Sequence, residues 1–355
     1  MSPASAPGRT AAPIAAPSNA TAADTARRRL QLALAAIWLF DGVLQLQPFM
    51  FTKQFAATIM GPAADGNPPL IADPITWAAG IVSNHSVGTN LLFAVIQVGL
   101  GVAIAWRPAV RIGLAASVAW ALGVWWFGEG FGGLLTGDAD PVSGAPGAVI
   151  LYAIAAVLLW PTARGGPFPA AGFTGARSAR AVWAVLWGGL AGLSLQSANT
   201  DPDAMHDMLT SMAQGEPGWL ASLQNNAASL LAGKGLATAI VLAAVFAVIA
   251  AAPFPHSPRA VRALLVLAIA TAAVIWVVGQ AAGGLLLGTG TDLNSGPLLI
   301  LLALAYWPPA AGSPARQSQP TVIVATADGD PPPPRETVET GSLTGSLTRS
   351  PGGTA

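Results

Sequence analysis

The sequence lacks cysteine and has little charge. The absence of cysteine from 355 residues excludes disulfides, thiolate metal sites and cysteine nucleophiles. Charged residues make up only 9% of the chain, against roughly 25% in an ordinary soluble domain. The 16 basic and 16 acidic residues cancel, whereas a nucleic-acid-binding domain needs a basic face. We therefore expect no nucleic-acid partner.

Recognisable catalytic motifs are missing as well. The chain contains no Walker loop, HExxH, GxSxG or haem-attachment sequence, and each of these motifs carries a specific chemistry. A membrane-bound haem would need histidines inside apolar segments, but His256 falls in a polar loop. The sequence therefore identifies no particular cofactor and argues against a self-contained enzyme.

Apolar residues dominate what is present. They form 53% of the chain, the mean hydropathy is +0.57, and a lone helix needs roughly 20 apolar residues to span a bilayer. This composition predicts an all-α integral membrane protein with eight transmembrane helices, some of them short enough to need shielding by neighbours. The eight apolar segments are 31–47, 89–106, 110–127, 146–160, 182–197, 235–252, 261–278 and 296–308.

The polar segments divide the chain into five parts. Small polar residues and proline dominate both ends, which cannot bury enough apolar surface to fold. We expect a disordered cytoplasmic tail, a four-helix unit, a cytoplasmic linker, a second four-helix unit and a second disordered tail, over 1–26, 27–161, 162–180, 181–308 and 309–355.

The distribution of positive charge predicts the orientation. Three consecutive arginines, 27–29, precede the first apolar segment, and the other arginines fall in the tails or in alternate loops. The remaining loops hold both lysines, Lys53 and Lys234. Because cytoplasmic loops carry an excess of positive charge, both termini are expected in the cytoplasm.

The two halves of the chain resemble each other. Residues 124–135 and 275–286 share a tryptophan and a Gly-Gly-Leu-Leu end, and no gap separates the pairs Trp125/Trp276 and Pro146/Pro297. A repeat of four spans keeps its direction, so we expect two parallel four-helix repeats. In the long outer loops, amphipathic interfacial helices are predicted at 49–60, 75–84, 202–213 and 219–226.

A four-span unit with a long outer loop after its first helix resembles the DoxX-like family of bacterial membrane proteins, taken twice over roughly 30–161 and 181–308. The resemblance is architectural and transfers no functional residue. It implies a redox context, because some members of that family are associated with quinone-linked or membrane redox complexes. The expected location is the bacterial inner (cell) membrane, with the lipid bilayer and other membrane or extracytoplasmic proteins as partners.

Two carboxylates stand out near apolar segments. Asp41 lies within the first segment, where an ionised carboxylate costs roughly 2.5–3.5 kcal/mol on insertion scales, and Gln45 is one helical turn away. Glu129 ends the third segment, and Gln280 is its counterpart in the second half. Each carboxylate is interpreted either as a hydrogen-bonding group between helices or as a proton- or ligand-handling group.

Other candidates have simpler alternatives. Trp126 fits an aromatic belt or a ligand contact, and Gln97 fits an interhelical hydrogen bond or a ligand contact. The glycine-rich segments 128–146 and 279–297 precede short apolar segments, which indicates either a binding site or plain interfacial loops. The segment with Met205, His206, Met208 and Met212 is interpreted either as a copper(I) site or as a helix face that binds lipid.

Two functions remain open from the sequence. The first is a non-catalytic, accessory subunit of a membrane redox or envelope complex with an outer-leaflet cavity for a lipid or quinone. The second is a proton-coupled transporter of a small molecule or ion, copper included, with Asp41 or Glu129 as the coupling acid.

Overall fold

The computed structural model describes residues 19–308, and every regular element in that range is a helix, with no strand. The first helix, α1, runs over Asn19–Leu44, so residues 19–26, expected in the tail, are helical. The buried side chain of Arg27 explains these extra turns, because it binds Asp24 at 2.7 Å and the Pro169 carbonyl at 3.2 Å. The rest of the expected tails, 1–18 and 309–355, lies outside the described residues.

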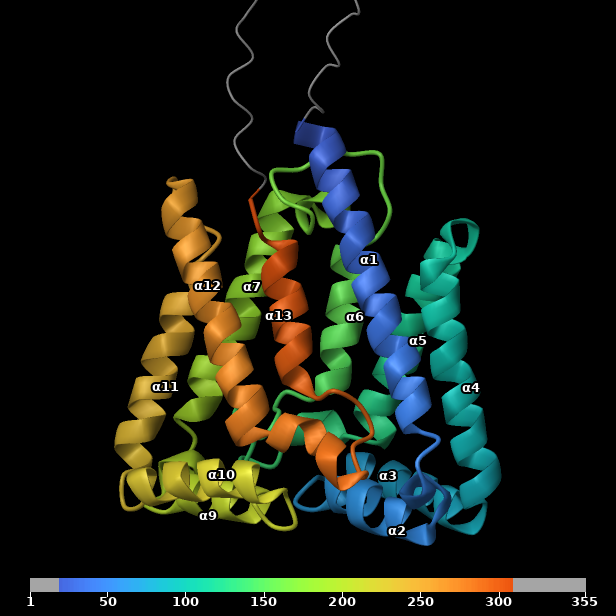
Figure 1. The fold of residues 1–355 in the computed structure, drawn as a ribbon, viewed down its shortest axis with the longest axis vertical. Coiled ribbons are helices and arrows are strands. Elements are labelled where there is room, and N and C mark those ends of the chain that lie inside the picture. Colours follow the sequence, from blue (N-terminus) through green and yellow to red (C-terminus); the bar gives the residue numbers. More distant parts are fainter. Residues whose placement is uncertain (1–18, 309–355) are drawn as a thin grey trace, which may run out of the picture. The chain divides into compact units, whose positions relative to one another are not determined.

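A group of long and short apolar helices runs between the two ends of the bundle (Figure 1). Its first and last members, α1 and α13, bring residues 19 and 308 to the same end. The last member, α13, covers Ser295–Ala305, and the members between are α4 (Ser86–Ala105), α5 (Val110–Phe127), α6 (Ala148–Leu158), α7 (Ala171–Ser194), α11 (Gly235–Ala250) and α12 (Pro258–Val274).

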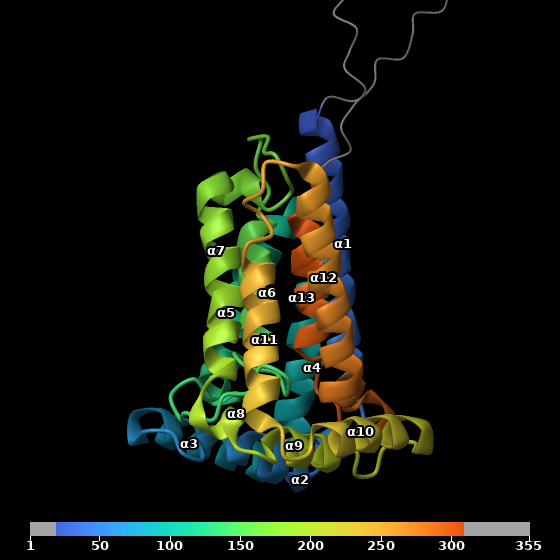
Figure 2. The same ribbon diagram turned by 90° about the vertical axis from the view of Figure 1, so that its left-hand side faces the viewer.

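A second group of helices lies across the opposite end of the bundle (Figures 1 and 2). The segments in which interfacial helices were expected are helical here. From the first half come η1 (Pro48–Phe51), α2 (Lys53–Phe55), η2 (Ala56–Met60), η3 (Gly61–Ala64) and α3 (Pro69–Asn84). The second half supplies α8 (Ser197–Thr200), α9 (Ala204–Met212) and α10 (Gly218–Leu231).

Among the described residues, three helices are long and apolar enough to cross a membrane: Ser86–Ala105, Arg107–Phe127 and Pro258–Gly279. The second of them joins η4 (Arg107–Ala109) to α5, and the third joins α12 to η6 (Ile275–Gly279). A fourth is reached if α10 and α11, bent by 107°, count as one span. The helices α6 and α13 are apolar but short. These lengths are compatible with a membrane protein and leave the expected eight spans without direct support.

The two short helices form the centre of the fold. Most residues of α6 and of α13 are buried, and the two helices pack against each other. Around them the halves use the same pairings: α1 packs on α4 as α7 packs on α11, and α5 packs on α6 as α12 packs on α13. The short helices are therefore shielded by neighbours on nearly every side.

Close contact between α1 and α4 depends on glycine. A Cβ atom at Gly101 would lie 2.6 Å from Leu39 Cγ and 2.8 Å from the Ala35 carbonyl oxygen. Gly99, two residues earlier on the same helix, has no atom within 4 Å of such a Cβ. The two helices can approach each other only because position 101 carries no side chain.

We expect Gly101→Ala to destabilise the protein by about 1–3 kcal/mol, because the added methyl group overpacks the α1–α4 contact. Gly99→Ala is the matched control and should leave stability unchanged or raise it by up to about 1 kcal/mol, since alanine favours the helix. Thermal unfolding in detergent measures both. Equal melting temperatures for the two variants would contradict the contact.

Candidate functional site

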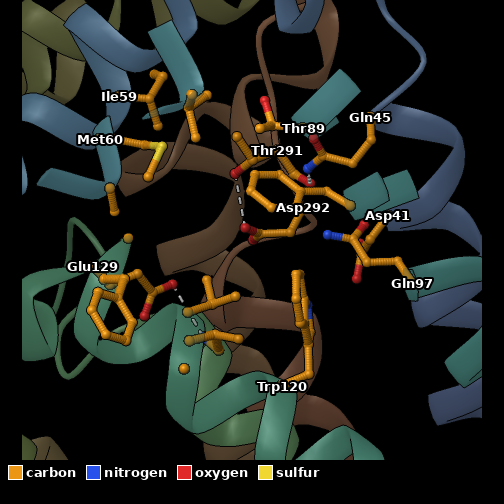
Figure 3. A pocket seen from close by; sticks show the side chains of 18 of the residues that line it. Asp41, Gln45, Ile59, Met60, Thr89, Gln97, Trp120, Glu129, Thr291 and Asp292 are labelled. Atoms are coloured by element: carbon orange, nitrogen blue, oxygen red, sulfur yellow. Dashed lines mark hydrogen bonds between the residues drawn. The ribbon is translucent and has the colours of Figure 1, made fainter. Parts of the chain in front are cut away.

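A cavity of about 460 Å³ lies between α1, α3, α4 and α5 (Figure 3). We call it the ligand cavity. Its walls are largely apolar and aromatic, and its polar groups come from α1, α4, α5, α6 and the segment before α13. These polar groups are Asp41, Gln45, Thr89, Gln97, Trp120, Glu129, Tyr152, Thr291 and Asp292.

Asp41 is almost fully buried, with 1% of its surface exposed. Its Oδ2 accepts a hydrogen bond from the hydroxyl of Tyr152, which is also buried. The Tyr152 ring packs on Trp38 with the ring centres 4.2 Å apart. Asp41 is thus hydrogen-bonded between α1 and α6 and borders the ligand cavity.

The two glutamines leave acceptor atoms free. Gln45 donates from Nε2 to the Thr291 carbonyl at 3.3 Å, while its own Oε1 has no partner. Gln97 is 8% exposed, and its Oε1 is also unpaired. Trp120 offers an unpaired Nε1–H on the same cavity. Unpaired buried polar atoms are costly, so a bound molecule with hydrogen-bonding groups would stabilise this end of the cavity.

Glu129 caps the helix that follows it. Its Oε1 accepts a hydrogen bond at 3.2 Å from the backbone N–H of Val149, in the first turn of α6. Burial, reinforced by the nearby Asp292 carboxylate, raises the pKa of Glu129 to about 8. This carboxyl group can therefore gain or lose a proton near neutral pH.

Gln280 has the same structural role in the second half but lies away from the ligand cavity. It accepts from the Gly296 N–H at 3.3 Å, in the first turn of α13, and donates to Ser295 Oγ at 2.7 Å. Trp126 also lies outside this cavity, stacked on Phe127 with the ring centres 5.3 Å apart. Of the six candidates from the sequence, the structure gathers Asp41, Gln45, Gln97 and Glu129 and leaves out Gln280 and Trp126.

Sequence reasoning missed Asp292 and Tyr152. Asp292 lies in the second glycine-rich segment, where its two oxygens accept from the Asn294 N–H at 2.5 Å and Thr291 Oγ1 at 2.9 Å. Burial raises its pKa. The sequence did contain an indication of Asp292, because it is the only carboxylate in the glycine-rich segment 279–297, which was interpreted as a possible binding site. Tyr152 is one of only two tyrosines in the chain and the only hydroxyl-bearing residue of the apolar helix α6.

Asp292 reaches this site because the glycine-rich segments cross between the halves. The Gln47 side chain, just after α1, donates to the Gly290 carbonyl at 3.0 Å. In the other direction, Asn199 donates to the Ala139 carbonyl at 2.9 Å. The Ala139 and Gly290 carbonyls are separated by the same number of residues as Trp125 and Trp276. Each half therefore binds the glycine-rich segment of the other half at a corresponding carbonyl group.

The copper hypothesis gains no support from packing. The residues Met205, His206, Met208 and Met212 all lie on α9 and do not line the ligand cavity. Residues 19–308 contain no group of three or more His, Asp or Glu side chains placed to hold a metal ion. The copper site remains a prediction from the sequence.

Comparison with protein-family models, with curated proteins and with solved structures gives no match. The site is therefore interpreted from its own geometry.

The raised pKa of Glu129 makes stability depend on pH. The folded state binds the proton more tightly than an unperturbed carboxyl group of pKa 4.5, so stability should fall as pH rises from about 4.5 to about 8. In Glu129→Gln this contribution disappears, and the melting temperature in detergent should fall less over that interval. Asp65→Asn, at an exposed position, is the control and should keep the wild-type slope. An unchanged slope in Glu129→Gln would contradict the burial of an ionisable group.

Proposed function

We propose that the chain crosses the bacterial inner membrane eight times, with both termini in the cytoplasm. The short helices are the main objection, since 11 residues of α6 extend only about 16 Å. Two features answer it: α6 and α13 are surrounded by other helices, and the glycine-rich segments before them continue the chain towards the outer end. Irregular backbone is tolerated in a membrane protein where it is buried in protein or lines a cavity.

The proposal includes an internal duplication into two parallel four-helix units of DoxX-like layout. Three observations support it: the matched helix pairings, the reciprocal crossing of the glycine-rich segments, and the caps of Glu129 and Gln280, each at the second residue of the following helix. A common ancestor of the two halves would explain why a glutamate in one half and a glutamine in the other accept a hydrogen bond from the same backbone position.

This topology can be tested by cysteine accessibility, because the natural chain has no cysteine. Single cysteines at the exposed positions Gln54 and Ser211 should react with a membrane-impermeant maleimide in intact spheroplasts. Cysteines at the exposed positions Ala163 and Ser257 should react only after lysis. If both sets were labelled in intact spheroplasts, or if Gln54→Cys and Ser257→Cys reacted to the same extent there, the eight-span arrangement would be overturned.

We further propose that the ligand cavity binds a lipid-soluble molecule of lipid or quinone type, and that the protein is an accessory, non-catalytic subunit of a membrane redox or envelope complex. The observation that carries this proposal is the cavity itself, whose largely apolar walls are interrupted by a few polar groups, among them Asp41, Gln97 and Glu129. Ligand sites commonly combine an apolar lining with a few polar groups that orient the ligand. An amphiphilic molecule would bury its apolar part against the aromatic lining, which includes Trp38 and Phe93, and direct its polar atoms to the polar groups of the cavity.

The second candidate is proton-coupled transport. It is favoured by the three carboxyl groups of the cavity, which no lysine or arginine of its lining neutralises. Proteoliposomes carrying a pH-sensitive dye would distinguish the two. Uptake of protons with substrate that is lost in Asp41→Asn supports transport, whereas unchanged dye signals in both proteins support the accessory role.

A glycine offers a way to fill the cavity without a clash. Gly123 on α5 lines the ligand cavity, and a Cβ there would meet no atom within 4 Å. Gly189 on α7 also has free space around it and is exposed, but it lies outside the cavity. The two positions form a matched pair.

We expect Gly123→Leu to reduce the bound molecule at least about fivefold, since a penalty of about 1–3 kcal/mol corresponds to a loss of affinity of roughly 5- to 150-fold. Gly189→Leu should retain it. Mass spectrometry of organic extracts from the purified proteins measures the occupancy. An extract without any stoichiometric lipid-soluble molecule, or equal amounts from both variants, would count against the proposed function.

A further inference from the structure

A second cavity of about 380 Å³ lies between the two glycine-rich segments. We call it the vestibule. Unlike the ligand cavity, it is lined mainly by backbone and small polar residues, among them Gly132, Ser143, Gly147, Gly283 and Asn294. Such a lining suits water rather than a lipid-soluble molecule.

The vestibule and the ligand cavity share a wall. Glu129, Thr291 and Asp292 line both. Glu129 comes from the end of α5 in the first half, and Asp292 from the segment before α13 in the second half. Two carboxyl groups therefore stand between an apolar cavity and a polar one.

The Glu129 carboxyl group is held in place but not saturated. Its Oε1 receives the Val149 N–H, whereas its buried Oε2 has no hydrogen-bond partner. Gly147 leaves room for this second oxygen, because a Cβ at that position would lie 2.2 Å from Oε2. The free oxygen is available to bind or release a proton.

No lysine, arginine or histidine side chain in the lining of either cavity competes for this proton. The titratable groups that line the ligand cavity with Glu129 are Asp41 from α1, Tyr152 from α6 and Asp292. Two neighbouring carboxyl groups repel each other when both are ionised, so ionisation of one favours the protonated form of the other. The pKa of Glu129, about 8, allows the exchange near neutral pH.

We propose that Glu129 and Asp292 form a proton passage between the ligand cavity and the vestibule, through which the acids of the ligand cavity exchange protons with the outer side of the membrane. In each transfer, the O–H bond of one carboxylic acid breaks and the proton moves to the other carboxylate or to water in the vestibule, so that charge and atoms balance. The passage rests on the topology and the cavity of the proposed function, and it requires no ligand to operate.

Infrared difference spectroscopy on oriented membrane vesicles tests the passage without a ligand. Raising the pH on the outer side alone should remove the carbonyl stretch of a protonated carboxylic acid, whereas raising the inner pH alone should leave it. In Glu129→Gln the change should disappear, and Asp292→Asn should slow it about tenfold or more, as expected when one partner of a proton relay is lost. Asp65→Asn, outside both cavities, is the control for an exposed carboxylate.

A blocked vestibule provides the independent variant. Ser143→Cys places a thiol in the vestibule, and a bulky impermeant maleimide attached there should slow the loss of the carbonyl band. The same reagent should not label Ser194→Cys, where the side chain is buried within α7. Response to the inner pH, or an unchanged rate after Ser143→Cys is labelled, would overturn the passage.

The outcomes separate the two proposals. If the carbonyl band responds to the outer pH but no lipid-soluble molecule copurifies, the passage stands and the ligand-binding function fails. If a molecule copurifies and is lost in Gly123→Leu, but the carbonyl band responds to the inner side, the ligand-binding function stands and the passage fails.

Discussion

The fold depends on capping two short, buried apolar helices at their N-terminal ends. The backbone N–H groups in the first turn of a helix have no partner within the helix, and α6 and α13 begin inside the protein. Glu129 accepts from the Val149 N–H and Gln280 from the Gly296 N–H. Two tryptophans stabilise the segments in between: Trp125 donates to the Pro146 carbonyl at 2.7 Å, and Trp276 to the Leu293 carbonyl at 2.8 Å. This arrangement holds each glycine-rich segment against the bundle.

The first of the two proposed repeats carries polar residues that are missing at the aligned positions of the second. At the positions of Asp41 and Gln45, the second half carries Leu190 and Ser194. Ser194 is satisfied within its own helix, because its hydroxyl donates to the Leu190 carbonyl at 2.9 Å. Gln280 can cap a helix as Glu129 does, but an amide cannot exchange a proton in this way. Most polar groups of the ligand cavity therefore come from the first half, and the second half adds Thr291 and Asp292.

The crossing of the glycine-rich segments explains why the second half is nevertheless needed. Asp292 and Thr291 close a cavity whose other walls belong to the first half. The vestibule lies between the two segments and takes residues from both. The first half on its own would lack both the Asp292 carboxylate and the wall of the vestibule that the second half supplies.

The sequence by itself predicted the all-helical class, helices in the segments that lie across one end, and Asp41, Gln45, Gln97 and Glu129 as candidate residues, all of which line the ligand cavity. These features follow from local patterns: runs of apolar residues, and polar side chains interrupting them. The tertiary structure decided that Tyr152 binds Asp41, that Asp292 enters the site, and that Gln280 and Trp126 stay out of it. Those outcomes depend on which distant segments pack together, and hydrophobic patterning indicates that a helix face is buried without identifying the partner it is buried against.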